Sequence, residues 1–177
     1  MLDRLKSMLL ISCPSKMTAI EVKKLQQATD AEWCARVMTG SEPWVTLGRD
    51  YEESLQIITD LSKEVYISIV EGEAAGFIIL NMKGAFVGYV QTICIAPESR
   101  GRGIGSRLLE FAEDRIFSES PNVFLCVSSF NERARRLYER SGYSVIGELK
   151  DYLVRGHSEI LMRKSLGPLK DYKRESD

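Results

Sequence analysis

The sequence predicts an α+β fold: a mixed, mainly antiparallel, twisted sheet of about six to seven strands, flanked by about four helices. Two observations support this fold class. Three strand-like runs follow one another in the first half of the 177-residue chain, and the elements around them do not repeat as regular βαβ units. The apolar fraction of 44% and the charged fraction of 28% are those of an ordinary globular domain with a buried core.

The first third of the chain predicts one strand and two helices. Residues 18–23 have the pattern of a short strand, and residues 30–39 that of a helix, with Asp30 as a candidate N-cap and Gly40 at the end. After a segment rich in helix breakers and aromatic residues, apolar residues recur at helical spacing over 52–62. We therefore expect both helices to precede the main strands of the sheet.

The middle of the chain predicts an antiparallel meander of three strands. Strand-like runs cover residues 64–71, 77–82 and 87–96. The sequences EGEAAG and KGAF stand between them and are typical of turns. Such short connections favour antiparallel neighbours.

The second half alternates helices and strands. A helix is predicted over 102–117, a strand over 122–128 and a second helix over 132–141, which Gly142 ends. Two closing strands follow, and the turn between them is expected at residues 155–156.

Three glycines within five residues separate the third meander strand from the next helix. Gly101, Gly103 and Gly105 let another group approach the backbone closely, at the cost of conformational entropy. N–H groups that converge at a helix N-terminus bind anions, and Arg100 and Arg102 add cationic donors beside them. We interpret this segment as a phosphate-binding loop; the alternative is a flexible connection with solvated arginines.

Two common nucleotide motifs do not fit this loop. A P-loop needs a lysine directly after its glycines, and none follows here. A dinucleotide fingerprint needs glycine where Ser106 stands, and a carboxylate at the end of the next strand, which instead ends VSSFN.

Two motifs in the right order resemble the GNAT superfamily of N-acetyltransferases. Its first signature, an apolar strand, a proline and then [RQ]-x-x-G-x-[GA] at the start of a helix, is matched by residues 100–105. Its second signature, N-x-x-A-x-x-L-Y-x-x-x-G-[FY], is matched by Asn131, Ala134, Leu137, Tyr138, Gly142 and Tyr143. The resemblance is tightest over 89–143 and extends to about 20–163 in the order of elements.

The resemblance implies the acyl-CoA N-acyltransferase fold, with splayed central strands, and acetyl-CoA as cosubstrate. It implies that the backbone of the third meander strand pairs with the pantetheine arm and that the glycine loop takes the pyrophosphate. Asn131 is either an N-cap, a contact to the cofactor arm, or both. The implied cofactor-binding residues are Ile93, Cys94, Ile95, Arg100, Gly101, Arg102, Gly103, Ile104, Gly105, Ser106 and Asn131.

Tyr138 is the candidate catalytic residue. By resemblance its hydroxyl protonates the departing thiolate of CoA; the alternative is a core tyrosine that packs beside Leu137. No glutamate stands where some members of the superfamily place a general base, because those positions hold Tyr89 or Gln91, and Cys126. Three alternatives remain for the loss of the proton from the acceptor: a water chain, a carboxylate from the N-terminal helices such as Glu42 or Glu53, or an acceptor amine that is already partly neutral.

The acceptor is expected to be a small-molecule or peptide amine that attacks directly in a ternary complex. Cys126 as a nucleophile is less well supported, since the only histidine, His157, is remote in sequence. Candidate acceptor-binding residues are Trp44, Arg49, Tyr51 and Tyr89. Tyr152 and Arg155, with His157, could line the other side of the pocket. A non-catalytic CoA-binding sensor or interaction module is the alternative function.

Composition and charge give no indication of several other classes of binding partner. The formal net charge of −1 gives no indication of nucleic-acid or membrane binding, and no cluster of His, Cys and carboxylates predicts a metal site. The four widely spaced cysteines suit free thiols in the cytoplasm, where we expect the protein, with a homodimer as a further expectation. We interpret residues 1–16 as an N-terminal extension, because their apolar run is too short for an export signal. We expect the acetyltransferase domain over 17–166 and a polar tail over 167–177.

Overall fold

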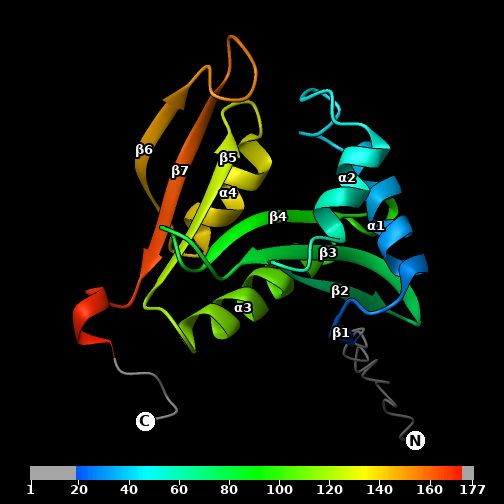
Figure 1. The fold of residues 1–177 in the computed structure, drawn as a ribbon, viewed down its shortest axis with the longest axis horizontal. Helices are drawn as coiled ribbons and strands as arrows, with labels where there is room; N and C mark the ends of the chain where they lie inside the picture. Colours follow the sequence, from blue (N-terminus) through cyan, green and yellow to red (C-terminus); the bar gives the residue numbers. More distant parts are fainter. Residues whose placement is uncertain (1–18, 173–177) are drawn as a thin grey trace, which may run out of the picture.

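Seven strands form one sheet in the computed structural model, which describes residues 19–172 (Figure 1). The strands are β1 (Ile20–Lys24), β2 (Glu64–Val70), β3 (Glu73–Asn81), β4 (Tyr89–Ile95), β5 (Asn122–Ser128), β6 (Ser144–Lys150) and β7 (Ser158–Ser165). The α-helices are α1 (Ala28–Thr39), α2 (Tyr51–Ile58), α3 (Ile104–Phe117) and α4 (Glu132–Arg140). Short 3-10 turns are η1 (Pro97–Ser99) and η2 (Leu169–Asp171).

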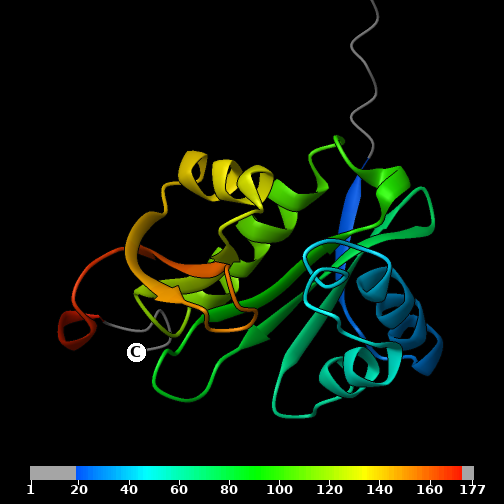
Figure 2. The same cartoon turned by 90° about the horizontal axis from the view of Figure 1, so that it is seen from above.

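The sheet is mixed, and its order is β1-β2-β3-β4-β5-β7-β6. Neighbouring strands are antiparallel except β4 and β5, which are parallel. Seen from above, α1 and α2 cover one face of the sheet, while α3 and α4 lie together on the other (Figure 2). The predicted fold class, including the β2–β3–β4 meander, is confirmed.

Strand β3 has a core on each of its faces. Ile78 and Leu80 belong to the cluster that packs against α3, whereas Phe77 and Ile79 belong to the cluster that packs against α1. This alternation is the period-two geometry of a strand, and burial on both faces explains the unbroken apolar run in its sequence.

Strands β4 and β5 pair at their starts and then part. Only Tyr89 and Val90 of β4 have register partners in β5. On its other side, β4 pairs with β3 until its end, with a register shift that leaves Gln91 as an extra residue. Such a bulge bends a strand and increases its twist, so β4 leans away from β5 beyond this point. The splayed central strands expected from the sequence are therefore present.

Gly88 makes the close approach before the splay possible. Its φ is +84°, and its carbonyl accepts a hydrogen bond from the Phe124 N–H at 2.9 Å. A Cβ atom at this position would clash with the Ile116 side chain of α3 and the Asn122 carbonyl of β5. Only glycine fits where these three elements meet.

Several predicted boundaries were wrong. Helix α1 begins at Ala28, with Gln27 at the N-cap, so Asp30 lies in the first turn and is not the cap. Helix α2 begins one residue before the predicted range because Asp50 and Glu53 form a capping box.

The turn between β2 and β3 is shorter than expected. Glu71 and Gly72 both have positive φ and complete the reversal, so β3 begins at Glu73 rather than at residue 77. The connection from β6 to β7, expected at 155–156, spans residues 151–157.

The cysteines that the structure describes, Cys34, Cys94 and Cys126, are free thiols, as expected. Cys13 and the predicted extension over 1–16 lie outside the described residues. Within residues 19–172, no helix combines the length and apolar character needed to cross a membrane.

Candidate active site

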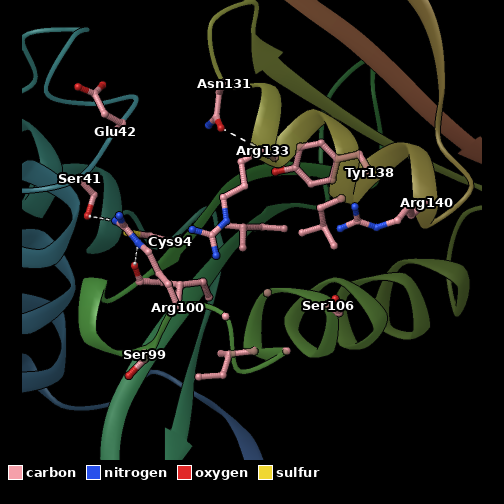
Figure 3. Close-up of a pocket in the computed structure, with 18 of the residues that line it drawn as sticks. Ser41, Glu42, Cys94, Ser99, Arg100, Ser106, Asn131, Arg133, Tyr138 and Arg140 are labelled. Atoms are coloured by element: carbon pink, nitrogen blue, oxygen red, sulfur yellow. Dashed lines mark hydrogen bonds between the residues drawn. The ribbon is translucent and has the colours of Figure 1, made fainter.

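The first cavity, called here the glycine-loop cavity, opens where β4 leaves β5 and has a volume of about 450 Å³ (Figure 3). Its walls are the end of β4, the loop over 99–106 and one side of α4. The backbone edge of residues 91–95 that faces β5 pairs with no strand of the described residues. The predicted cofactor residues Ile93, Cys94 and Ile95 all line this cavity.

The glycine loop presents its backbone to the cavity. Gly101 and Gly103 have φ values of +82° and +79°, and an added Cβ at either would meet no heavy atom within 4 Å. Gly103 is the N-cap of α3 and supplies no side-chain cap. Among the hydrogen bonds of residues 19–172, none uses the N–H groups of residues 101–106. These free donors at the positive end of a helix form an anion-binding cradle.

The two arginines of the loop lie differently. The Arg100 guanidinium donates from Nε to the Ile95 carbonyl at 3.2 Å and from Nη2 to Ser41 Oγ at 3.1 Å, which holds it in the cavity wall. Arg102 forms an ion pair with Glu71 at 3.6 Å and is not among the residues that line the cavity. The structure thus places only the first of the two predicted cationic donors at the site.

Helix α4 supplies two further cations that the sequence analysis missed. Arg133 and Arg140 line the glycine-loop cavity together with Leu137, and neither forms an ion pair with another residue of 19–172. By contrast, Arg135 and Arg136 pair with glutamates of the same helix. The spacing of positions 133, 137 and 140 puts them on one helix face, a signal readable from the sequence.

Cys94 and Asn131 show structural roles alongside their place in the cavity. The Cys94 thiol lies against α1, with its Sγ 3.9 Å from the Val37 carbonyl, so β4 offers its backbone rather than this side chain. Asn131 caps α4, since its Oδ1 accepts a hydrogen bond from the Ala134 N–H at 3.2 Å. The capping role expected of Asn131 is confirmed, and its contact to a cofactor stays a prediction.

Tyr138 lies where two cavities meet. It is 8% exposed and its ring packs beside Tyr143, with ring centroids 6.0 Å apart. Its hydroxyl points away from α4 towards the cavity (Figure 3) and has no hydrogen-bond partner within the described residues. Burial raises the pKa of Tyr138 to about 12, so the phenol keeps its proton at neutral pH.

The second cavity, called here the β5–β7 cavity, has a volume of about 500 Å³ and lies on the other side of Tyr138. Three of the four predicted acceptor residues line it, namely Trp44, Arg49 and Tyr89. Tyr51 does not, because it packs against the core cluster beneath α1 and α2. Both cavities share Trp44 and Tyr138, so they form two arms of one space.

The candidate bases are now distinguishable by position. The Glu53 carboxylate accepts from the Asp50 N–H at 3.4 Å within the capping box and lines neither cavity. Glu42 lines both cavities but is exposed. Burial raises the pKa of the Cys126 thiol, and His157 packs its ring against Phe130 instead, with centroids 4.9 Å apart. This arrangement does not provide an activated cysteine.

Glu159 is a site residue that the sequence analysis missed. It lies on β7 opposite Ser128 of β5, lines the β5–β7 cavity and is 6% exposed. Its Oε1 accepts a hydrogen bond from Ser128 Oγ at 2.6 Å. Burial raises the pKa of Glu159. A glutamate directly before the apolar run over 160–162 of the closing strand was the available signal.

The acetyltransferase (GNAT) family matches residues 25–143, and the chain therefore belongs to it. The chain is 33% identical over 110 residues to an uncharacterized N-acetyltransferase of Methanocaldococcus jannaschii, covering 59% of this chain and 70% of that protein. It is 28% identical over 126 residues to the spermidine N(1)-acetyltransferase of Escherichia coli K12, covering 69% of this chain and 66% of that one, just under two thirds.

A solved structure shows the same fold. The aminoglycoside 6'-N-acetyltransferase complexed with coenzyme A superposes with a TM-score of 0.68 at 15% identity, over 84% of this chain and 98% of that one. The protein is thus an acetyl-CoA-dependent acetyltransferase by family, with acetyl-CoA as cosubstrate. The glycine-loop cavity fits this molecule. Its N–H groups and its arginines, which have no partners among the described residues, suit phosphates, and the edge of β4 that pairs with no described strand suits amides.

Replacing both Arg133 and Arg140 with alanine is expected to weaken CoA binding about 10-fold, because the cavity loses two cations that form no ion pair within residues 19–172. Calorimetric titration with CoA measures this loss. The matched control is the double alanine variant of Arg135 and Arg136, which removes the same charge from the same helix. Equal affinities for both double variants would show that only net charge matters and would contradict the assignment.

Proposed function

We propose that the protein transfers the acetyl group of acetyl-CoA to a primary amine, by direct attack in a ternary complex. The observation that carries this proposal is the meeting of two cavities at Tyr138. One arm has the donors and cations that suit CoA, and the other is open to a second molecule. A cosubstrate and an acceptor that enter from different arms meet at one hydroxyl group, which suits transfer without a covalent enzyme intermediate.

Each wall of the glycine-loop cavity has a proposed role in holding acetyl-CoA. The N–H groups of residues 101–106, with Arg133 and Arg140, would bind its phosphates, and the free edge of β4 at 93–95 would pair with its amide arm. When bound, the cosubstrate supplies a thioester carbonyl that is already activated towards an amine.

Tyr138 is proposed to act as the general acid. Its neutral hydroxyl reaches the junction of the cavities and can donate a proton to the departing sulfur. A route through cysteine is disfavoured, because Cys94 is buried against α1 and burial raises the pKa of both Cys94 and Cys126. The alternative of a non-catalytic CoA-binding module leaves the β5–β7 cavity without a purpose.

The acceptor is proposed to be a compact amine, free or at a peptide end. The β5–β7 cavity carries charges of both signs, from Glu42, Glu159, Arg49 and Lys63, so it suits an amine that also has polar or charged substituents. The relative named for spermidine supports a small-molecule amine as one such class.

Acetyl-CoA-dependent thiol release should occur only when a suitable primary amine is present. The expected result is turnover with at least one member of a panel of spermidine, an aminoglycoside, an aminoalkylphosphonate and an alanine-terminated peptide. Free thiol is followed with a chromogenic reagent, and mass spectrometry of the product must show one added acetyl group. CoA binding without thiol release on any amine would favour the sensor alternative.

Replacing Tyr138 with phenylalanine is expected to lower kcat by about 10²-fold while CoA affinity stays nearly the same, because the ring remains and only the hydroxyl is lost. Tyr143→Phe is the matched control, since this neighbouring buried tyrosine lines neither cavity. Steady-state kinetics and thermal midpoints are measured for both variants. Should Tyr138→Phe change only the midpoint, the residue is structural and the acid must lie elsewhere.

A further inference from the structure

A buried carboxylate that lacks a cation lies in the wall of the β5–β7 cavity. Glu159 is 6% exposed, and the hydrogen bond from Ser128 Oγ is the one its carboxylate accepts within the described residues. Burial raises its pKa, and the serine bond opposes this only in part. Burying an ionised carboxylate is costly unless a cation compensates it. The wall therefore leaves room for a positive charge beside Glu159.

The nearest titratable groups do not supply that charge. Cys126 lies on the same face of β5 as Ser128, and Tyr89 projects from β4. Burial and then the nearness of Cys126 and Glu159 raise the pKa of Tyr89, and burial raises that of Cys126. Both are therefore neutral at physiological pH.

Within the described residues, no other charged group of the cavity forms an ion pair with Glu159. Lys63 forms an ion pair with Asp60 at 3.2 Å. Arg49 lines the cavity from the segment before α2 and forms no ion pair with Glu159. Glu42 is exposed, so water solvates it. Among these groups, Glu159 is the only carboxylate that an incoming cation would relieve of a desolvation cost.

We propose that Glu159 binds the ammonium group of the acceptor and takes one of its protons, which makes it the general base of the transfer. The proposal rests on the proposed function and adds the residue that selects for a cationic amine. Ser128 is its positioning residue, because its hydroxyl fixes the orientation of the carboxylate. Glu159 lines the same cavity as Tyr138, so the base and the acid face one space.

The proton and electron balance is simple. The acceptor enters as an ammonium ion and gives one proton to Glu159, which frees the nitrogen lone pair. The N–C bond to the carbonyl carbon forms and the C–S bond breaks, with its electron pair leaving on sulfur. The nitrogen loses its second proton as the amide forms, while Tyr138 gives one to sulfur and regains one. In total, one ammonium and one thioester give one amide, one thiol and one proton.

Because the pKa of Glu159 is raised, the free energy of unfolding should depend on pH through this residue. A carboxyl whose folded pKa lies above its unfolded value stabilises the fold when protonated, and this contribution is lost as pH rises through the folded pKa. Glu159→Gln keeps the shape and removes the charge. Its thermal midpoint should therefore exceed that of the wild type at pH 8, and the difference should shrink as pH falls towards the ordinary glutamate pKa of about 4.3.

The test combines this midpoint series with kinetics on the full chain. Glu148→Gln is the matched control, because Glu148 is exposed on β6 and its loss removes the same charge. For the amine of the panel that turns over fastest, Glu159→Gln should lower kcat/KM about 10²-fold near neutral pH, with CoA affinity unchanged. The loss should diminish as pH approaches the pKa of the amine itself, where the neutral acceptor needs no base.

The outcomes are distinguishable. A pH-dependent midpoint difference together with an amine-dependent rate loss supports the proposal. A midpoint difference that is absent, or equal to that of Glu148→Gln, shows that Glu159 is not an unpaired buried anion and overturns it. An unchanged kcat/KM in Glu159→Gln overturns it as well. If the wild type acetylates no amine, the proposed function fails. The midpoint series alone then tests whether Glu159 is a buried anion without a compensating cation.

Discussion

The parting of β4 and β5 after Val90 is the constraint on which the site depends. Two parallel strands that start as hydrogen-bonded neighbours separate, and β4 is left with a free backbone edge. Gly88 allows the tight contact that precedes the separation, and the bulge at Gln91 bends β4 away. Unpaired backbone groups at a sheet edge need water or a ligand as partner. Both cavities open from this gap, and α4 with Tyr138 closes it on one side.

Local charge, not net charge, shapes the two arms. The chain is nearly neutral, yet the glycine-loop cavity gathers Arg100, Arg133 and Arg140 around free N–H groups at the start of α3. The β5–β7 cavity instead carries charges of both signs, and its one buried carboxylate, Glu159, lies on β7 opposite Ser128 of β5. In the roles proposed above, the arginines favour the anionic cosubstrate in one arm, and Glu159 favours an ammonium group at one point of the other arm.

Local patterns predicted most of the fold and half of the site. Strand alternation and the glycine loop are patterns of residues that are close in sequence. The sequence therefore predicted the order of elements and the phosphate-binding loop. Arg133 and Arg140 required the helix to be placed beside the loop, and Glu159 required the β5–β7 register that brings it to Ser128. Asp30 is not the cap because α1 begins two residues before it, at Ala28, and Tyr51 packs into the core instead of a cavity. For Arg133, Arg140, Glu159 and Tyr51, contacts between elements distant in sequence decided the outcome.

Hydrogen–deuterium exchange with and without CoA tests the central claim, that the free edge of β4 and the amides of the glycine loop hold the cosubstrate. The account predicts that CoA slows exchange over residues 91–106, while the edge strand β6 exchanges at the same rate in both states. Exchange that is unchanged over 91–106 in the presence of saturating CoA, or protection confined to another part of the chain, would contradict it.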